Sequence, residues 1–329
     1  MPASTHACRH SVVWKTRWVV ALVACSTWPA AARWAGAEPA RAPAVEQATY
    51  ERETQPPQPN SVRFARRAPE VGDQVEQTVA VALRLGTLVR QGSELLEQTK
   101  TAIRRDQRRV VTTTEVMSGR SMAAVVRYAA ATKQVAAGQA AADLADGPVT
   151  PQPVEGKTYR CRREGDELRI TDADGNIPPL DEFEIVALNM DSLGRSNPLS
   201  EFLAGRAVSV GETIEVPAEL AEKLLGLGDT LGEVTRFSLR LDKVQAVDGA
   251  ECAVFHASIE AASSDSSQMR LEMEGPLVIQ AATCRAVQAS LTGPIGMSET
   301  RGSLTATYQM TGAGKMTVGI VSQYRDVSR

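Results

Sequence analysis

Ser121 and His256 are the residues whose types could perform nucleophilic catalysis. The segment "GRSMA" (119–123) resembles the nucleophile elbow G-x-S-x-G, with Ala123 in place of the final glycine. That elbow requires a strand, a sharp turn and a helix, whereas the residues after Ser121 alternate as in a strand. The candidate base, His256, falls on the polar side of another alternating run. The pattern disfavours a hydrolase that uses Ser121 and His256, and we assign no catalytic residue.

A second candidate for chemistry is an acidic loop that begins like a calcium site. In "DADGNIPPLDE" (172–182), oxygen donors occupy the first, third and fifth positions. Ile177 and Phe183 stand where the EF-hand motif needs glycine and glutamate. We therefore expect a tight turn here and assign no metal ligand.

A third candidate is the basic run "KTAIRRDQRR" (100–109), in which lysine and arginine surround Asp106. Such a run could bind phosphate or an anionic polymer, although a solvated face is the more common explanation. The sequence contains no glycine-rich phosphate loop and no CxxC pair, and no cofactor is predicted.

The N-terminal segment "RWVVALVACSTWPAAARWAGAEPARAP" (17–43) predicts export. A basic flank precedes an uncharged run, Trp18–Ala24, that is too short to span a membrane permanently. Two processing sites overlap: cleavage between Ala37 and Glu38, which we favour, and a lipobox in which Cys25 would be lipidated. Both place the protein in the periplasm or cell envelope, as a soluble protein in the first case and a lipid-anchored one in the second. A membrane contact is predicted only through Cys25.

Cleavage of the predicted signal peptide (1–37) would remove most of the histidine and tryptophan side chains, which commonly bind metals and sugars. The 329-residue chain has a net charge of −3, and all four tryptophans and two of its three histidines lie in that segment. His256 is the histidine that would remain. An acidic exported protein with so few imidazoles and aromatics is a poor candidate for binding nucleic acid, for a histidine metal cluster or for an aromatic sugar platform.

The cysteines leave a choice open. Outside the cytoplasm a disulfide can form, and both Cys252 and Cys284 lie in predicted strands. We favour these two as a pair, with Cys161 left over. Three free buried thiols are the alternative.

The chain after the leader divides into three parts. Residues 38–72 are rich in proline and polar residues and predict a disordered tether. Residues 73–150 form an N-terminal β-rich part, within which 93–107 is ambiguous between helix and strand. Residues 151–329 form a C-terminal antiparallel β domain with short helices, predicted at 182–192, capped by Asp181, and at 218–225.

Most of the C-terminal part alternates apolar with polar residues, as in Phe237, Leu239 and Leu241 against the residues between them. Turn residues separate these runs at hairpin spacing, including "TGAGK" (311–315) near the end. The expected fold class is mainly β (α+β): an antiparallel, curved or partly closed sheet of hairpins, with two or three short helices covering one face.

Three segments carry a resemblance: "PVEGKTYRCRREGDELRITDADG" (153–175), "GRAVSVGETIEVP" (205–217) and "FSLRLDKVQAVDGAECAVF" (237–255). With the leader and tether, they resemble uncharacterised exported bacterial β-rich proteins. In architecture the chain is similar to lipoprotein-localisation (LolA/LolB-like) half-barrels, which implies a curved sheet around helices that can hold an acyl chain. No ligand-binding residue is carried over.

These observations favour a non-enzymatic exported cell-envelope protein, with a structural role or with an unknown envelope partner or apolar ligand. The first alternative is a periplasmic carrier of lipid or acyl chains of the LolA/LolB-like type. The second, a hydrolase using Ser121 and His256, has the least support.

Overall fold

The computed structural model describes residues 61–138, 141, 147–225, 233–263, 267–303 and 306–327. The predicted signal peptide, its cleavage site at Ala37 and Glu38, the possible lipidation site Cys25 and the tether up to residue 60 lie outside these residues.

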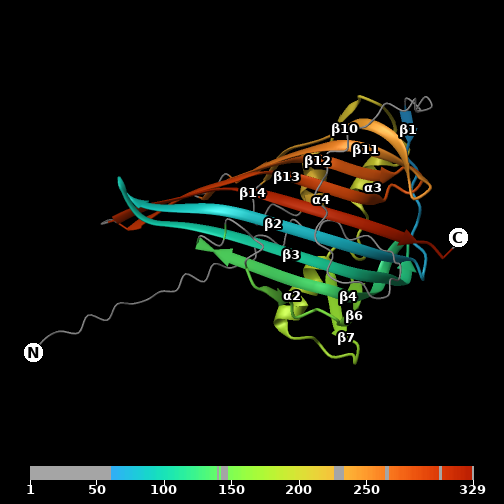
Figure 1. The fold of residues 1–329 in the computed structure, drawn as a ribbon. Coiled ribbons are helices and arrows are strands. Elements are labelled where there is room, and N and C mark those ends of the chain that lie inside the picture. The colour runs from blue at the N-terminus through green and yellow to red at the C-terminus, as the bar shows by residue number, and fades with distance from the viewer. Residues whose placement is uncertain are drawn as a thin grey trace, which may run out of the picture.

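One antiparallel sheet of twelve strands dominates the described chain, together with a small two-stranded sheet and three short helices (Figure 1). The strands are β1 (Ser61–Arg63), β2 (Gln74–Gln91), β3 (Glu94–Met117), β4 (Arg120–Ala137), β5 (Val149–Pro151), β6 (Thr158–Glu164), β7 (Glu167–Asp172), β8 (Ala207–Ser209), β9 (Thr213–Glu215), β10 (Glu233–Val247), β11 (Ala250–Ala262), β12 (Ser267–Gln280), β13 (Ala286–Ser303) and β14 (Ala306–Arg325). The helices are α2 (Leu180–Asn189), α3 (Pro198–Leu203) and α4 (Ala218–Leu225). The predicted fold class is confirmed.

The strand order makes the two predicted β parts a single sheet. It runs β7-β6-β4-β3-β2-β14-β13-β12-β11-β10-β9, with β5 beside β4, and β1 pairs separately with β8. The last strand, β14, returns to pair with the first long strand, β2, from Gln74 opposite Arg325 to Gln91 opposite Tyr308. The division predicted at residue 150 therefore falls within one continuous sheet.

Alternating side chains give the sheet two unlike faces, of which we call the one that carries the helices the inner face. On β11, Phe255, Ala257 and Ile259 are buried in the main core cluster, together with residues of α3 and α4. A second cluster lies under α2, where Val186 and other helix residues pack on β3, β4, β6 and β7. Apolar side chains facing inward and polar ones outward explain why these runs form strands that bury a single side.

Two hairpins close on two-residue turns whose residues adopt a left-handed backbone. Ser118-Gly119 joins β3 to β4, and Asp248-Gly249 joins β10 to β11; all four residues have positive φ. Left-handed conformations at both central positions match the right-handed twist of the flanking strands. Antiparallel strands flank each of these turns, and β6 and β7 form a further hairpin.

Several local predictions are wrong. The ambiguous segment 93–107 is part of strand β3, and 311–315 lies in the middle of β14 rather than in a turn. Helix α2 starts at Leu180 after Pro179, without a side-chain cap, and Asp181 accepts a hydrogen bond from the next backbone N–H instead. Helix α3 is not predicted. Residues 61–72 belong to the fold rather than to the tether, because β1 pairs with β8 and Phe64 is buried against Phe255.

Glycines allow neighbouring strands to approach closely in the middle of the sheet. A Cβ atom added at Gly293 would lie 1.9 Å from the backbone oxygen of Glu272 on β12, and one at Gly314 would lie 2.0 Å from that of Arg84 on β2. At these positions the backbone of the next strand takes the place of a side chain.

We expect Gly293→Ala to lower the free energy of unfolding by about 1–3 kcal/mol, because the new methyl group must displace a neighbouring backbone. Gly296→Ala on the same strand is the matched control, since its nearest atom would be 4.0 Å away. Urea denaturation of both variants measures the difference. Equal stability of the two variants would contradict the close approach at Gly293.

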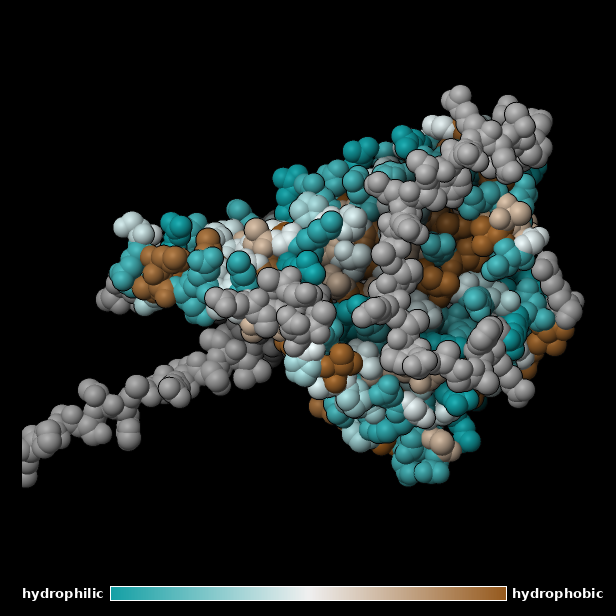
Figure 2. Space-filling view, in the orientation of Figure 1, coloured by the Kyte–Doolittle hydropathy of each residue, from teal (hydrophilic) through white to brown (hydrophobic). Residues whose placement is uncertain are grey.

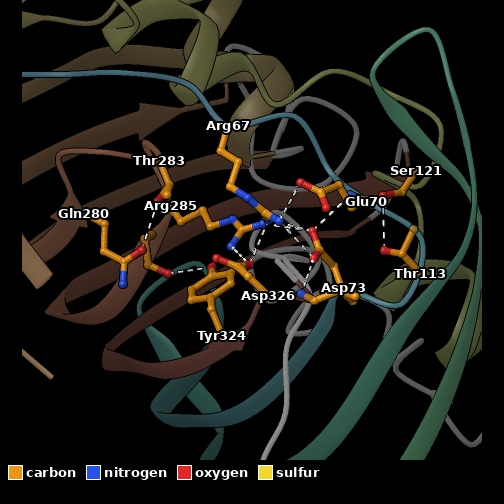
Figure 3. Close-up of polar contacts among 12 residues, drawn as sticks. Arg67, Glu70, Asp73, Thr113, Ser121, Gln280, Thr283, Arg285, Tyr324 and Asp326 are labelled. Carbon is orange, nitrogen blue, oxygen red and sulfur yellow. Dashed lines mark hydrogen bonds and ion pairs between the residues drawn. The ribbon is translucent and has the colours of Figure 1, made fainter. Parts of the chain in front are cut away.

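An ion network ties together the chain segments at one end of the sheet (Figure 3). Arg67 Nη1 lies 2.7 Å from Asp73 Oδ2 and 2.8 Å from Asp326 Oδ1, and Arg285 Nη1 lies 2.6 Å from the same Asp326 oxygen. Arg67 and Asp73 precede β2, Arg285 precedes β13 and Asp326 follows β14. Burial alone would raise the pKa of Asp73, but hydrogen bonds from Arg67 and from two backbone N–H groups hold it below its usual value.

We expect Asp73→Asn to lower the free energy of unfolding at pH 7 by about 3 kcal/mol, because it removes one of the two largely buried carboxylates that Arg67 and Arg285 share and leaves Asp326 to compensate both. The carboxylate stabilises the fold above its unfolded pKa of about 3.9, and this contribution disappears as the pH falls through the lower pKa of the folded state. The stability difference between wild type and variant should therefore shrink below about pH 4.

Glu70→Gln is the control for this series, because Glu70 is half exposed and pairs with the same arginine. Its effect should stay below about 1 kcal/mol. Denaturation midpoints measured from pH 7 to pH 2 test both statements, and an Asp73→Asn protein as stable as wild type at pH 7 would refute the role of the network.

Candidate ligand-binding site

The basic run of β3 is divided between the two faces of the sheet. Arg104 and Arg108 point outward and pair with Asp106 and Glu76, with Arg104 Nε 2.7 Å from Asp106 Oδ2. Arg105 alternates with them and points to the inner face, and so does Arg109. Because side chains alternate along a strand, the acidic partners of this run lie on the outer face. The two inner arginines are left without them.

Arg109 lies in a buried polar row that crosses the inner face. The register aligns Tyr128 on β4, Arg109 on β3, Gln77 on β2 and Ser322 on β14. Arg109 Nη2 donates to Gln77 Oε1 at 2.5 Å, and Gln77 Nε2 donates to Ser322 Oγ at 3.3 Å. On β2, this row separates Val75, which belongs to the cluster under α2, from the main cluster.

The guanidinium of Arg109 is only partly satisfied. The residue is 0% exposed, yet its Nε and Nη1 atoms have no hydrogen-bond partner, and it makes no ion pair with any described residue. Burial lowers the pKa of Arg109, and the same burial raises the pKa of Tyr128 to about 12. A buried charge without a counter-charge destabilises a fold, so its presence needs a reason other than stability.

A second pair of cations lies on the same face. Lys133 of β4 is directly opposite Arg105 of β3 in the register, and both side chains are partly buried. Burial and then the charge of Arg105 lower the pKa of Lys133, and burial lowers that of Arg105. Arg105 Nε has no hydrogen-bond partner, and within the described chain neither residue forms an ion pair. Like charges directly opposite each other on a sheet repel.

The row that contains this cationic pair continues with apolar residues, of which Val81 and Val318 are buried and Leu291 is only partly buried. Arg105 is opposite Val81 on β2, Val81 is opposite Val318 on β14, and Val318 is opposite Leu291 on β13. The next row along the inner face is apolar throughout: Val135, Ile103, Leu83 and Met316. The inner face is thus cationic on β3 and β4 and apolar from β2 towards β13.

The helices are too short to cover this surface. Helix α4 has 8 residues and spans about 12 Å, whereas the 18 residues of β2 span about 60 Å. Figure 1 shows β2, β3, β13 and β14 extending beyond the part of the sheet where the helices lie. Leu83, Leu85, Leu291 and Ile320 border the main cluster and are only partly buried. Figure 2 shows apolar residues gathered in a hollow near α3 and the adjoining part of β13 and β14, with hydrophilic residues below it.

The structure does not bring the predicted catalytic residues together. Ser121 lies on β4 and His256 on β11, with five strands of the sheet between them, which corresponds to about 25–30 Å. Ser121 is followed by a strand rather than a helix, and its Oγ lies 3.3 Å from Thr113 Oγ (Figure 3). His256 is on the outer face, 3.7 Å from Glu274.

The predicted disulfide is also not formed: Cys161, Cys252 and Cys284 are all free and buried. Cys252 belongs to a small cluster with Val254 and Val278, whereas Cys284 belongs to the main core. The two thiols lie in different packing layers, and spacing along the sequence could not reveal this. The alternative of three free buried thiols describes the structure.

The acidic loop is a turn, as expected. Asp172 Oδ1 accepts hydrogen bonds from the backbone N–H groups of Asp174 and Asn176, both at 2.9 Å. No cluster of residues suited to a metal ion occurs in the part of the chain that the structure describes. In that same part, no helix has the length and apolar character needed to cross a membrane.

Comparisons with known proteins show only weak similarity. No family model and no curated protein matches the chain. Among solved structures, the chain is similar to one of lipid–protein interactions in lipovitellin (TM-score 0.34, 9% identity), covering 76% of this chain and 25% of that one. It is also similar to a LolA superfamily protein from Nitrosomonas europaea (TM-score 0.12, 7% identity), covering 72% and 84%. The chain spans a quarter of the lipovitellin chain, and such low TM-scores establish neither a common fold nor a common function.

We expect Arg109→Met to raise the free energy of unfolding of the ligand-free protein by about 1 kcal/mol or more, because it removes a buried, incompletely paired charge at similar volume. Arg104→Met on the outer face is the matched control, with an expected change of about 0.5 kcal/mol or less. Chemical denaturation measures both variants. Marked destabilisation by Arg109→Met would mean that this arginine is retained for stability.

Proposed function

We propose that the protein is a non-enzymatic exported binding protein of the cell envelope, and that its inner face holds an apolar ligand such as an acyl chain. The supporting observation is the apolar surface of β2, β13 and β14 that the three helices leave partly exposed. Export is inferred from the leader sequence, and a binding role without catalysis from the separation of Ser121 and His256.

The side chains on this surface suit an acyl chain. Leu83 and Leu85 follow one another on the inner side of β2 and, like Leu291 on β13, are only partly buried. Met316, opposite Leu83, is buried in the core, where its flexible and polarizable thioether can adapt when an alkyl chain packs on the leucines. The shortage of large aromatic side chains is therefore no obstacle to an apolar ligand of this kind.

Leu83→Gln should weaken the binding of an apolar ligand about tenfold, since it removes one apolar contact of roughly 1.5 kcal/mol. The neighbouring substitution Arg84→Gln is the matched control, because Arg84 is exposed on the outer face of the same strand. Titration with the neutral fluorescent probe N-phenyl-1-naphthylamine measures both affinities.

The proposal fails if wild-type protein does not bind the probe, or if the two variants lose the same affinity. Circular dichroism and the urea midpoint of each variant confirm that a loss of binding does not reflect unfolding. If protein side chains filled the inner face completely, the probe would show no saturable binding.

A further inference from the structure

The unpaired cations of the inner face point to the chemistry of the ligand's polar end. Arg105 and Lys133 are register partners on adjacent strands, so their Cβ atoms lie about 5 Å apart on one face. The charge of each disfavours the charge of the other, and the pKa of Lys133 is lowered in part for this reason. Opposite charges at these two positions would stabilise the sheet, whereas like charges destabilise it.

The neighbouring acids could have neutralised this pair but lie on the wrong side. Asp106 follows Arg105 directly in the chain and faces outward, where it pairs with Arg104. Glu76 of β2 also faces outward and pairs with Arg108. No carboxylate of the described residues forms an ion pair with the inner cations. The positive charge on the inner face is therefore uncompensated within the described chain.

A third cation, Arg109, lies on the same side of β3 but is buried. It lies four residues from Arg105 on the same face of β3, about 13 Å along the strand. Gln107 lies between them and is held by Gln152 and Asn189 through its amide group, at 3.2 Å in each case. Arg109 is fully buried and has two unpartnered nitrogen atoms. Arg105 and Lys133 therefore border the partly buried apolar side chains of β2 and β13, and Arg109 adds a buried positive charge farther along β3.

We propose that Arg105 and Lys133 bind the oxyanion of an amphiphile, a phosphate or carboxylate group, whose alkyl chain lies on β2, β14 and β13. This inference rests on the proposed function and names its ligand class. An oxyanion between Arg105 and Lys133 removes their repulsion and accepts charge-assisted hydrogen bonds from both. The alkyl chain then continues along the partly buried leucines Leu83, Leu85 and Leu291.

The experiment compares decyl phosphate with decanol, which has the same alkyl chain and no charge. Each displaces N-phenyl-1-naphthylamine from the protein, and inorganic phosphate alone is the third competitor. For wild type we expect decyl phosphate to bind about tenfold more tightly than decanol or more, with inorganic phosphate causing no displacement at the same concentration. Added salt should weaken the binding of decyl phosphate and leave decanol unchanged.

Arg105→Gln and Lys133→Gln should each reduce the affinity for decyl phosphate to near that for decanol, without changing the affinity for decanol. Arg104→Gln is the matched control on the outer face and should behave as wild type. Arg105→Lys, which keeps the charge, should retain most of the preference and also shows that the position tolerates substitution.

Equal affinity of wild type for decyl phosphate and decanol would overturn this inference while leaving the proposed function intact. Displacement by inorganic phosphate as effective as that by decyl phosphate would also overturn it, because the site would then bind free oxyanions. Absence of probe and decanol binding would overturn the proposed function, and this inference with it.

Discussion

The pairing of β14 with β2 is the constraint on which the rest of the structure depends. It joins the end of the chain to its first long strand from Gln74 to Gln91. Without it, the cationic strands β3 and β4 and the apolar strands β10 to β13 would form two separate sheets. Its register brings Val318 beside Val81, and so places the apolar rows of one half in line with the cations of the other. The network of Arg67, Asp73 and Asp326 holds one end of this junction.

The inner face departs from what stability alone would favour. Opposed like charges at Arg105 and Lys133, and a buried arginine with unpartnered nitrogens, all reduce the stability of the free protein. Elsewhere the described chain pairs its buried charges, as Glu182 shows. Its carboxylate accepts hydrogen bonds from Lys157 and Tyr159, both at 2.6 Å, which lower its pKa although burial would raise it. The unpaired charge is thus localised to β3 and β4, next to the uncovered apolar surface.

Sequence reasoning reached the fold class and several local elements because their causes are local. Alternation predicts strands, and the helix predicted at 218–225, after Pro217, coincides with α4. Part of the candidate site also follows from local alternation. If residues 93–109 form a strand, Arg105 and Arg109 lie on one face of it, and Arg104, Arg108 and Asp106 lie on the other. The opposition of Lys133 to Arg105 depends on the register between strands, and the β14–β2 junction depends on contacts between opposite ends of the chain. Neither is encoded in a short window of sequence, and the wrong disulfide prediction has the same origin.

Selectivity for an amphiphile would follow mainly from the unfavourable free energy of binding a ligand that lacks either the anionic group or the alkyl chain. An alkane or a neutral lipid could occupy the apolar rows, but it would cover Arg105 and Lys133 without supplying hydrogen-bond acceptors of the right charge. Leaving buried polar groups unpaired costs more than a hydrogen bond contributes net. A free oxyanion would relieve the repulsion but would leave Leu83, Leu85 and Leu291 in contact with water. A ligand that carries both parts satisfies both surfaces at once, with its charged end toward β3 and β4 and its alkyl chain toward β14 and β13.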